Sequence, residues 1–413
     1  MFRNYLLTAW KVFMRRKLFT AINLLCIVLT LVVLMVVTAM LENTFFPSGV
    51  EGKGGRLLTV STLRQQSADG SSRSTTALGY KLVDKYLKPM QSASLVSAAT
   101  SASPVSAYQG DRVTELDLRR VDANYWKILD FKLLAGRLPT LDDEQQGRLV
   151  AVINETVAQQ LFAGGAAVGK PLDVGGQAFR VIGVVEDVQP DRNAYAEIWA
   201  PVTSFPTSTY KDTISGNFIA LLLADSPADL QRMRDEVAQI AKTVVPTDDD
   251  MKVARFWADT KLDDLARGLL GNYEQQESGA GALVEIIAIM MVLFMLLPAL
   301  NLVNLNTGRM LERSSEIGIR KSFGATSMQL VGQFLVENTL LCLLGGLIGL
   351  ACTAVILQWL EASGMVPYLK VSLNLAAVGY CLLITFVFGI LSGLIPAWKM
   401  SRLDPVHALK GTV

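Results

Sequence analysis

Residues 19–41 read FTAINLLCIVLTLVVLMVVTAML, an apolar run without a single charged side chain. A helix that crosses the ~30 Å hydrocarbon core of a bilayer needs about 20 such residues, because an α-helix rises ~1.5 Å per residue. Three further runs of comparable length follow in the C-terminal part of the chain. The sequence therefore predicts four transmembrane helices, at residues 18–41, 282–305, 329–360 and 374–396.

The first apolar run follows Arg15, Arg16 and Lys17, which is also how a secretory signal peptide begins. However, the apolar region of a signal peptide is only ~7–15 residues long, and no convincing cleavage site follows this run. We therefore interpret it as a retained membrane anchor.

Residues 1–17 have a helical pattern of their own. Apolar side chains recur at helical spacing, at Phe2, Tyr5, Leu6, Ala9, Trp10 and Phe13. This predicts an amphipathic helix that lies on the cytoplasmic surface of the membrane. A helix packed against a partner protein would show the same pattern, so both interpretations stay open.

The basic residues near the membrane predict the orientation of the chain. Residues 1–17 contain Arg and Lys but no acidic residue, and the segments 306–328 and 397–413 are also basic. Loops rich in Lys and Arg stay in the cytoplasm. The sequence therefore predicts cytoplasmic N- and C-termini, with residues 42–281 and 361–373 outside the cytoplasm.

Composition excludes several classes of function. The 413 residues are 51% hydrophobic, 18% charged and carry a net charge of +1, so no basic stripe suggests nucleic-acid binding. The single histidine, His407, cannot form an HExxH zinc site. The four cysteines lie only in the apolar runs, which excludes disulfides and cysteine-based zinc sites from residues 42–281. These cysteines are Cys26, Cys342, Cys352 and Cys381.

The segment outside the cytoplasm contains two similar strand–helix–strand patterns, which predict an α+β domain. The first comprises residues 57–63, 78–89 and 94–100, and the second comprises 217–224, 227–242 and 251–257. The fold class that we expect is thus an α-helical bundle of four transmembrane helices with a large α+β extracytoplasmic domain.

Within residues 42–281 the sequence also predicts a division into lobes. Residues 135–205 are richer in Gly, Pro and alternating strands, which favours an inserted β-rich lobe between two halves at about 50–134 and 206–260. Residues 260–281 are predicted to form a stalk helix that continues into the second membrane span.

Residues 164–170 spell G-x-x-x-x-G-K, the pattern of a phosphate-binding loop. That loop needs Ser or Thr as its next residue to bind Mg²⁺, and here Pro171 follows, which has no hydroxyl. We interpret the segment as a turn between a helix and a strand.

Several motifs resemble those of MacB/FtsX-type permeases, the type VII or mechanotransmission class of ABC transporter permeases. In the C-terminal part these are NLVNLN at 301–306, RSSEIGIRKSFGA at 313–325, QFLVEN at 333–338 and PAWKMSRLDP at 396–405. In the extracytoplasmic part they are VDANYW at 121–126, Gly136-Arg137, VINE at 152–155 and FRVIGVV at 179–185. The resemblance extends over nearly the whole chain, in the order of the family.

The resemblance implies a protein of the bacterial inner membrane whose periplasmic domain has a porter lobe and an inserted sabre lobe. It implies two permease protomers, identical or paralogous, and two copies of a separate ABC ATPase that binds ATP and Mg²⁺, so no cofactor is expected in this chain. A periplasmic adaptor and an outer-membrane channel are further partners in the family. MacB itself has an ATPase before its first helix, whereas here 17 residues precede the first span, and His407 stands where relatives often have an acid.

Residues 306–328 are predicted to form a cytoplasmic coupling helix. Glu312, Glu316 and Arg320 share one helical face, and Gly318 and Gly324 allow close backbone approach. A solvated, self-paired helix would show the same spacing, but the resemblance implies that this helix docks into a cleft on the ATPase. The predicted coupling residues are Glu312, Arg313, Glu316, Gly318, Arg320, Lys321 and Gly324.

Small and acidic residues interrupt the apolar runs. Glycines at helix-packing spacing predict close contact of the third and fourth spans with other helices, at Gly345, Gly346, Gly349, Gly389 and Gly393. For Glu285 and Glu337 we expect pairing or snorkelling towards the interface rather than a proton relay.

Together these features predict a permease without enzymatic activity of its own. Rocking of the first two spans would move the periplasmic domain and drive export of a lipid, peptide or small toxic molecule. The alternative is an FtsX-like signalling device that activates a cell-envelope partner without transport. A neighbouring gene for an adaptor and channel would favour export, and one for a cell-wall hydrolase would favour signalling.

Overall fold

In the computed structural model the chain forms two compact units, one of residues 1–42 with 284–413 and one of residues 43–283. We call them the membrane unit and the periplasmic unit and describe each by itself. The described residues are 11, 13–15, 17–45, 49–109, 112–162, 165–190, 192–246, 250–312, 319, 322–324, 326–365, 368, 378–380, 382–383, 386–387, 389–391 and 394.

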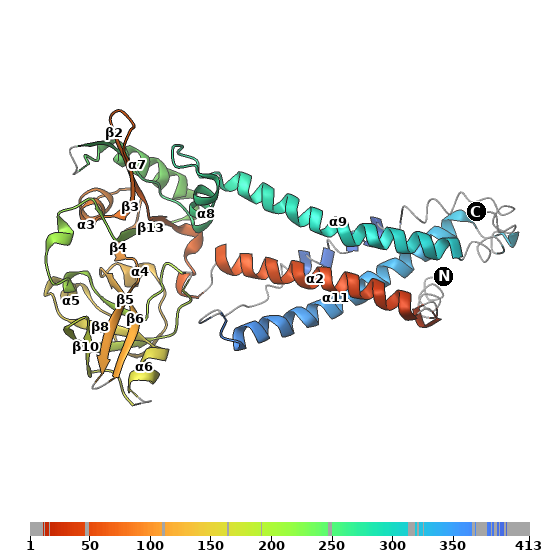
Figure 1. Ribbon diagram of the computed structural model, residues 1–413, viewed down its shortest axis with the longest axis horizontal. Coiled ribbons are helices and arrows are strands. Elements are labelled where there is room, and N and C mark those ends of the chain that lie inside the picture. The colour runs from red at the N-terminus through yellow and green to blue at the C-terminus, as the bar shows by residue number, and fades with distance from the viewer. Residues whose placement is uncertain are drawn as a thin grey trace. The chain divides into compact units, whose positions relative to one another are not determined.

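Three long helices dominate the membrane unit: α2 (Lys17–Phe45), α9 (Ala280–Glu312) and α11 (Ser327–Ala362) (Figure 1). Two of them, over Thr20–Phe45 and Val331–Ala362, are long and apolar enough to cross a membrane, and α9 is apolar over Ala280–Leu296. Most of the fourth predicted span lies outside the described residues. The number of four spans therefore stays a prediction.

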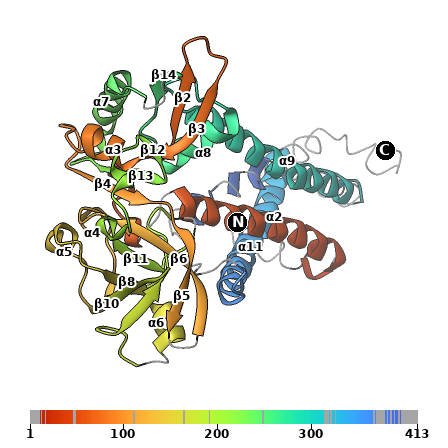
Figure 2. The same cartoon turned by 60° about the vertical axis from the view of Figure 1, so that its left-hand side comes forward.

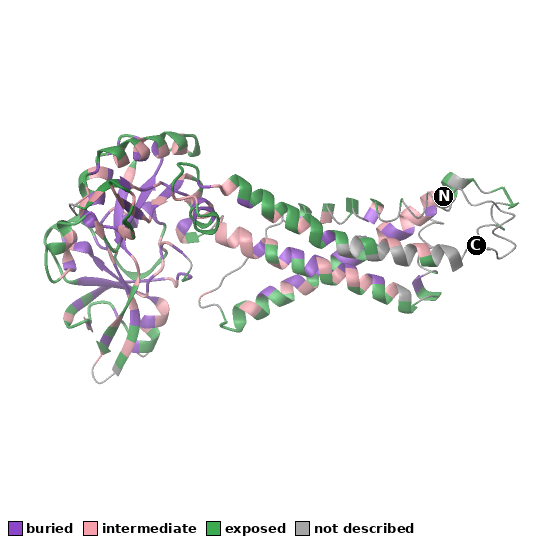
Figure 3. Ribbon diagram, turned by 45° about the horizontal axis from the view of Figure 1, so that its top comes forward, coloured by how far each residue is buried: buried purple, intermediate pink, exposed green. Residues whose placement is uncertain are grey.

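Exposed positions recur along these helices (Figure 3), and many of them carry large apolar side chains. Leu25 is 66% exposed on α2, Met290 is 65% exposed on α9 and Val355 is 64% exposed on α11. Exposed apolar surface of this extent is unfavourable in water but suits a hydrocarbon environment. The helices thus have the surface of membrane spans.

The periplasmic unit is built on one 14-stranded, mostly antiparallel sheet. Eleven strands follow the order β11-β8-β10-β9-β5-β6-β4-β13-β3-β2-β14, and β1, β7 and β12 pair beside this path with β13, β10 and β3. The strands are β1 (Leu57–Val60), β2 (Leu63–Ser67), β3 (Arg73–Leu78), β4 (Leu95–Thr100), β5 (Ser103–Gln109), β6 (Arg112–Val121), β7 (Leu133–Gly136), β8 (Val150–Asn154), β9 (Pro171–Val174), β10 (Gln177–Val185), β11 (Ile198–Pro201), β12 (Ser215–Gly216), β13 (Phe218–Leu223) and β14 (Met251–Arg255). The α-helices are α3 (Tyr80–Leu82), α4 (Tyr125–Ile128), α5 (Leu141–Gln145), α6 (Glu155–Phe162), α7 (Leu230–Thr243) and α8 (Lys261–Leu270).

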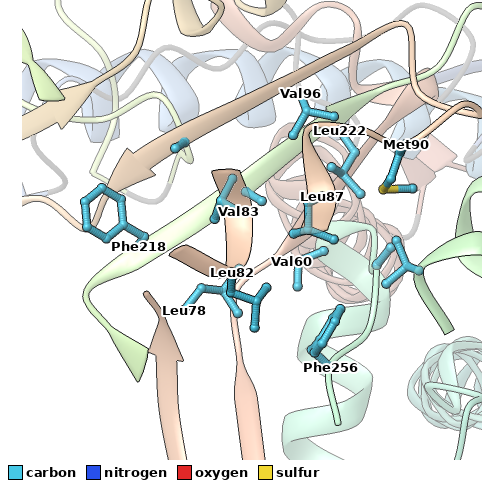
Figure 4. Close-up of a cluster of buried hydrophobic side chains, with 14 of the residues drawn as sticks. Val60, Leu78, Leu82, Val83, Leu87, Met90, Val96, Phe218, Leu222 and Phe256 are labelled. Atoms are coloured by element: carbon cyan, nitrogen blue, oxygen red, sulfur yellow. The ribbon is translucent and has the colours of Figure 1, made fainter. Parts of the chain in front are cut away.

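The first lobe comprises residues 57–100 and 202–258. Its central strand, β13, is a continuous apolar run, FIALLL, and every one of its residues is buried because the sheet is covered on both faces. Side chains from the strands, from α3 and from the segment after it converge in one apolar cluster (Figure 4). The elements β1, α3 and β4, and then β13, α7 and β14, stand where the sequence predicts its two strand–helix–strand patterns.

The second lobe comprises residues 103–201 and begins earlier than the sequence suggests. The sequence pattern places the hairpin of β5 and β6 in the first half, which it extends to residue 134. In the structure β5 pairs with β9, and β6 pairs with β5 and β11. Only one residue pair, Ala99 with Val121, joins β6 to β4 of the first lobe. The Gly- and Pro-rich composition that predicted the insert starts after this hairpin, which explains the error.

A buried apolar cluster connects the two lobes. It contains Leu57 and Ile219 of the first lobe and Tyr125, Trp126 and Trp199 of the second. The edge-to-face contact of Trp126 and Trp199, with ring centroids 6.3 Å apart, lies within it. The two lobes therefore share one continuous core.

The predicted continuous stalk helix over 260–281 is wrong. Helix α8 ends at Leu270 because Gly271 adopts a left-handed conformation, with φ +70°. Glycine has no Cβ and so allows this conformation at little cost. Residues 271–279 form a turn segment, and α9 begins at Ala280.

Asp143 offers a test of the second lobe. This fully buried carboxylate accepts hydrogen bonds from Arg137 (2.6 Å) and Arg148 (3.0 Å) and caps α5 from within. The bond from Arg137 holds the pKa of Asp143 below its usual value. We expect Asp143→Asn to lower the free energy of unfolding by ~1–3 kcal/mol at neutral pH, measured by chemical denaturation followed by tryptophan fluorescence.

Because the pKa of Asp143 is lowered on folding, its stabilisation is present above the unfolded-state pKa of ~3.9 and lost as the pH falls below it. The difference between variant and wild type should therefore shrink below about pH 4. The control is Asp142→Asn, an exposed partner of Arg148, for which we expect a loss under ~1 kcal/mol. Equal losses for the two variants would contradict the assignment.

Candidate functional site

Two segments connect the periplasmic unit to membrane helices and are the candidate site for transmitting motion. The N-terminal joint is residues 43–56, from the last turn of α2 to β1. The C-terminal joint is residues 257–279, from the end of β14 to α9. Both are built from residues of the periplasmic unit.

The N-terminal joint is bound to the second lobe at its start. The Asn43 side chain donates to Oε1 of Gln189 (3.1 Å) and accepts from Nη2 of Arg192 (2.8 Å). Arg192 also donates to Gln189 at 3.4 Å, so the three side chains form a closed polar triangle. The end of α2 is thus attached to the segment between β10 and β11.

Two charged side chains continue this attachment further along the N-terminal joint. Glu51 is buried and accepts the backbone N–H of Ala194 at 2.9 Å. Lys53 pairs with Asp130 at 2.7 Å and donates to the carbonyl oxygen of Lys127 at 3.0 Å. All of these partners belong to the second lobe.

The C-terminal joint is organised around Arg267 of α8. Its buried guanidinium pairs with both carboxylate oxygens of Asp259, at 2.8 and 3.2 Å. It also donates to the carbonyl oxygens of Asn272 (2.6 Å), Gln275 (2.9 Å) and Gln276 (3.1 Å), and it lies 4.5 Å from the ring centre of Trp257. One side chain therefore fixes the turn that sequence reasoning read as helix.

Asp263 fixes the same turn from the other side. It caps α8 through Thr260, pairs with Arg234 of α7 at 2.5 Å and accepts from Ser278 Oγ at 2.5 Å. Burial alone would raise the pKa of Asp263, but the hydrogen bonds from Ser278 and Thr260 outweigh it and lower the pKa. The carboxylate thus stays charged and joins α7, α8 and the residues just before α9.

For Asp259, the effect of burial on the pKa is larger than that of the hydrogen bonds. Burial raises the pKa of Asp259, although its ion pair with Arg267 opposes that shift. The backbone of Asp259 also forms a bridge with Thr59 of β1, with N–O distances of 2.8 and 2.9 Å. The C-terminal joint is therefore bound to the first lobe. The N-terminal joint is bound to the second lobe over residues 43–53, and its last residue, Arg56, is bound to Ala224 and Asp225 of the first.

In the membrane unit, four of the five glycines predicted to pack against helices are described, and each lies close to another segment. A Cβ added to Gly345 of α11 would stand 2.5 Å from Cγ2 of Ile27 on α2, and one added to Gly349 would stand 3.3 Å from Cβ of Leu31. A Cβ on Gly346 would stand 2.8 Å from Leu382, and one on Gly389 would stand 2.7 Å from Sγ of Cys342. Gly393 lies outside the described residues.

The two acidic residues of the predicted spans have different surroundings. Glu337 is buried on α11 and accepts a hydrogen bond from Gln333 at 2.9 Å, while the neighbouring Asn338 donates to the carbonyl oxygen of Gly389. Glu285 is exposed on α9. In the sequence analysis Gln333 and Asn338 count only as the ends of the motif QFLVEN and no contact is predicted for either, although amides within an apolar run are a usable signal.

Most of the predicted coupling residues lie outside the described part of the chain: Arg313, Glu316, Gly318, Arg320 and Lys321. Glu312 is the last residue of α9, and Gly324 has φ +88° shortly before α11 begins. Thr326 caps α11 through a capping box with Gln329. The role of these residues stays a prediction.

The secondary structure on either side of residues 164–170 is the reverse of that around a phosphate-binding loop. Helix α6 precedes it and strand β9 begins at Pro171, whereas a phosphate-binding loop follows a strand and opens a helix. The described end of the segment is occupied by Lys170, which lies 5.5 Å from the ring centre of Phe162.

Two family models match the chain. The MacB-like periplasmic core domain matches residues 20–240, and the FtsX-like permease C-terminal region matches residues 288–405. The uncharacterized ABC transporter permease YknZ of Bacillus subtilis is 27% identical over 338 residues, which are 79% of this chain and 77% of that protein. The macrolide export ATP-binding/permease protein MacB of Neisseria gonorrhoeae is 27% identical over 76% of this chain and 47% of that protein, so the chain spans about half of this relative.

Two solved structures are similar to part of this chain. The periplasmic region of MacB from Actinobacillus actinomycetemcomitans has 20% identity and a TM-score of 0.38, over 53% of this chain and 94% of that structure. The extracellular domain of YknZ from Gram-positive bacteria has 19% identity and a TM-score of 0.35, over 47% of this chain and 98% of that structure.

The C-terminal joint generates a stability prediction. Breaking a buried ion pair by removing one partner typically costs ~3–5 kcal/mol, because the other charge stays buried without compensation. We expect Arg267→Met to lower the free energy of unfolding by this amount, measured by urea denaturation followed by the fluorescence of Trp257 and its neighbours. The double variant Asp259→Asn/Arg267→Met should regain part of the loss, since it removes both charges.

The matched control is Arg232→Met on α7, whose side chain makes no ion pair within the described residues. Its effect should stay within ~0.5 kcal/mol. A loss below ~1 kcal/mol for Arg267→Met would show that the guanidinium does not hold the turn.

A second prediction concerns the packing of α2 on α11. Gly345→Ala should destabilise the membrane unit, because its Cβ would overlap Ile27, whereas Gly332→Ala on the same helix meets no atom within 4 Å. Alanine stabilises a helix relative to glycine by ~1 kcal/mol, so Gly332→Ala should be neutral or stabilising. The measurement is the midpoint temperature of thermal unfolding of each detergent-solubilised variant. Equal midpoints for the two variants would contradict the contact.

Proposed function

Because the chain belongs to the family of ABC transporter permeases with a MacB-like periplasmic core domain and an FtsX-like C-terminal region, we propose that it couples ATP hydrolysis in the cytoplasm to movement of its periplasmic domain. Members of this family work with an ABC ATPase subunit, either fused, as the name of MacB states, or separate. For this chain we propose a separate ATPase, which binds ATP and Mg²⁺.

The observation that carries the proposal is that the end of α2 and the residues before α9 are attached to different lobes. The end of α2 binds the second lobe through Asn43. The residues before α9 are held by Arg267 and Asp263, and this joint binds the first lobe through the bridge of Asp259 to Thr59 and the ion pair of Asp263 with Arg234. Since one buried core connects the lobes, the domain has two separate points at which force can act on it. Displacement of α2 relative to α9 would therefore tilt the domain as a body.

The orientation is part of the same proposal. Basic residues before α2, after α9 and at the C-terminal end of the chain favour cytoplasmic termini in the bacterial inner membrane. In this orientation residues 313–321 face the ATPase. The periplasmic unit then carries out the mechanical work on the opposite side of the membrane.

We further propose an assembly of two permease protomers with two ATPase subunits. Gly345 and Gly349 of α11 already lie against α2 within one chain, so we place the protomer interface on other surface of the membrane unit. An adaptor and an outer-membrane channel would extend the pathway through the envelope. The cargo class that we propose is a lipid, a peptide or a small toxic molecule, and the name of the MacB relative records macrolide export for that protein.

Signalling without transport is the alternative, and it would use the same two joints. The two functions differ in whether a compound leaves the cell. A cell-based extrusion assay with the ATPase co-expressed separates them, since a signalling device would change the activity of an envelope partner and leave the efflux of every tested compound unchanged.

The coupling segment provides the direct test. Removing one partner of a buried, hydrogen-bonded charge pair typically costs ~2–5 kcal/mol, whereas a solvated pair contributes less than ~1 kcal/mol. We therefore expect Arg320→Glu and Gly318→Leu to reduce co-purification of the ATPase, or to uncouple its hydrolysis from function, while the permease still inserts in the membrane. Arg309→Glu, a basic residue outside the proposed docking set, is the control. ATPase binding and hydrolysis within about twofold of wild type for both variants would refute the assignment.

A further inference from the structure

Strand β14 lies at the end of the sheet of the periplasmic unit. Among the strands that the structure describes, it pairs only with β2, in antiparallel register from Met251 opposite Ser67 to Arg255 opposite Arg64. In an antiparallel pair, alternate residues direct their backbone N–H and C=O groups away from the partner strand. The outer edge of β14 is therefore a template on which another strand can pair.

A groove runs along this open edge. Six consecutive residues of the strand side, Lys252–Trp257, line a cavity of about 420 Å³ together with Glu274–Gln276 and residues of α7, which packs beside β14 (Figure 2). A second cavity of about 450 Å³ shares Ala238, Phe256, Trp257 and Gln276 with the first and continues to Ser278. Each volume lies within the ~300–1,000 Å³ range of ligand pockets.

The side of the groove formed by α7 is apolar and lined by small residues. Ala238 and Ala241 present only methyl groups to the cavity, and Val244 extends this surface. Phe256 is buried beneath it as part of the core of the first lobe. Short side chains on α7 thus leave the space that a polypeptide backbone needs beside β14.

The charged residues that line the groove are predominantly basic. Lys242, Lys252 and Arg255 are positive, and Glu274 is the one acidic residue of the lining. Lys242 and Lys252 are exposed, and neither makes an ion pair within the part of the chain that the structure describes. The first cavity therefore carries an excess of positive charge, whereas the second is lined by Arg234 and by the acidic residues Asp259, Asp263 and Glu277.

The contacts of Glu274 show that the arginines beside the groove bind a carboxylate group. Its carboxylate pairs with Arg255 at 2.5 Å, with Arg64 at 3.4 Å and with Arg73 at 3.7 Å. Arg64 and Arg255 are direct cross-strand neighbours, an arrangement of like charges that is unfavourable without an anion between them. Three guanidinium groups share one partly exposed carboxylate, so a second carboxylate could bind beside it.

We propose that the groove between α7 and β14 binds an extended, acidic polypeptide segment, which adds to the sheet as a further strand next to β14. Its main chain would pair with the open edge. Alternate side chains would point to opposite sides of the sheet, one set towards Ala238 and Ala241, and the other, acidic, set towards Arg255 and its neighbouring arginines.

Other occupants fit the groove less well. An acyl chain would cover the unpaired backbone groups of β14 without forming hydrogen bonds, which is unfavourable. A second copy of β14 would bring Lys252 and Arg255 of both copies together, and the irregular register between Met251 and Val253 further hinders pairing with a regular neutral strand. An acidic strand compensates for both the backbone groups and the charges.

The test uses the full detergent-solubilised chain without its ATPase, so its outcome does not depend on the function proposed above. The probe is a fluorescently labelled decapeptide that alternates valine and glutamate, and binding is followed by fluorescence anisotropy at low salt. We expect saturable binding. Two control peptides, one N-methylated at alternate residues and one with lysine in place of glutamate, should each bind at least about tenfold more weakly.

Variants of the chain separate the groove from general electrostatic attraction. Lys242→Glu and Lys252→Glu change exposed side chains, so the fold should be kept, and each should weaken peptide binding about tenfold. Lys85→Glu, an exposed lysine of the same lobe outside the groove, should leave binding unchanged. Glu274→Gln should strengthen binding, because it frees three arginines for the peptide.

Three results would overturn the proposal. The first is equal binding of the N-methylated peptide, since strand addition needs the main-chain N–H groups. The second is unchanged binding by both lysine variants. The third is self-association of the purified chain that Lys252→Glu abolishes and the peptide does not displace, because the occupant would then be a second copy of the chain.

Discussion

The guanidinium group of Arg267 determines how the chain leaves the periplasmic unit. It holds Asp259, which is bridged to β1 of the first lobe, and three backbone carbonyl groups of the turn that follows α8, so the break at Gly271 is fixed in one conformation. A continuous helix here would have no such connection to the sheet. With the turn, movement of the residues before α9 acts on Asp259 and, through its bridge to Thr59, on β1. A buried charge is costly, but here it is fully hydrogen-bonded, which is the condition under which such a group makes a rigid connection.

The two joints differ in strength, and the difference matters for a protein that transmits force. At the N-terminal joint, Asn43 makes two hydrogen bonds, and net contributions of ~0.5–1.5 kcal/mol are typical of such bonds. At the C-terminal joint, the loss of Arg267 leaves a buried carboxylate uncompensated, at a typical cost of ~3–5 kcal/mol. Under load, the contact of Asn43 with the second lobe would therefore open before that of Arg267 with Asp259, while Glu51 and Lys53 still hold the N-terminal joint further along. In the proposed cycle, α9 is the stiff connection and α2 the compliant one.

The sequence predicted the elements whose signals are local and periodic. Long apolar runs predicted α2, α9 and α11. The run FIALLL predicted β13, because a strand that is buried on both faces has no position for a polar side chain. The hairpin of β5 and β6 was assigned to the wrong lobe, since strand partners are chosen by contacts between residues far apart in the chain. The turn at Gly271 was missed because Arg267 and Asp263 look like ordinary surface charges of an amphipathic helix until Asp259 and Ser278 lie beside them. Spacing along one segment cannot reveal ion pairs between segments.

The groove along β14 and the C-terminal joint share a segment of chain, which gives ligand binding a physical route to the membrane helix. Gln275 and Gln276 line the groove, and their carbonyl oxygens are also acceptors of Arg267. Glu274, directly before them, is the carboxylate with which an acidic peptide would compete for Arg255. A peptide that displaces Glu274 would thus loosen residues 274–276 at the point where Arg267 holds them, a few residues before α9. By reciprocity, a change in the position of this turn that is driven from α9 would change the affinity of the groove, since linked equilibria act in both directions.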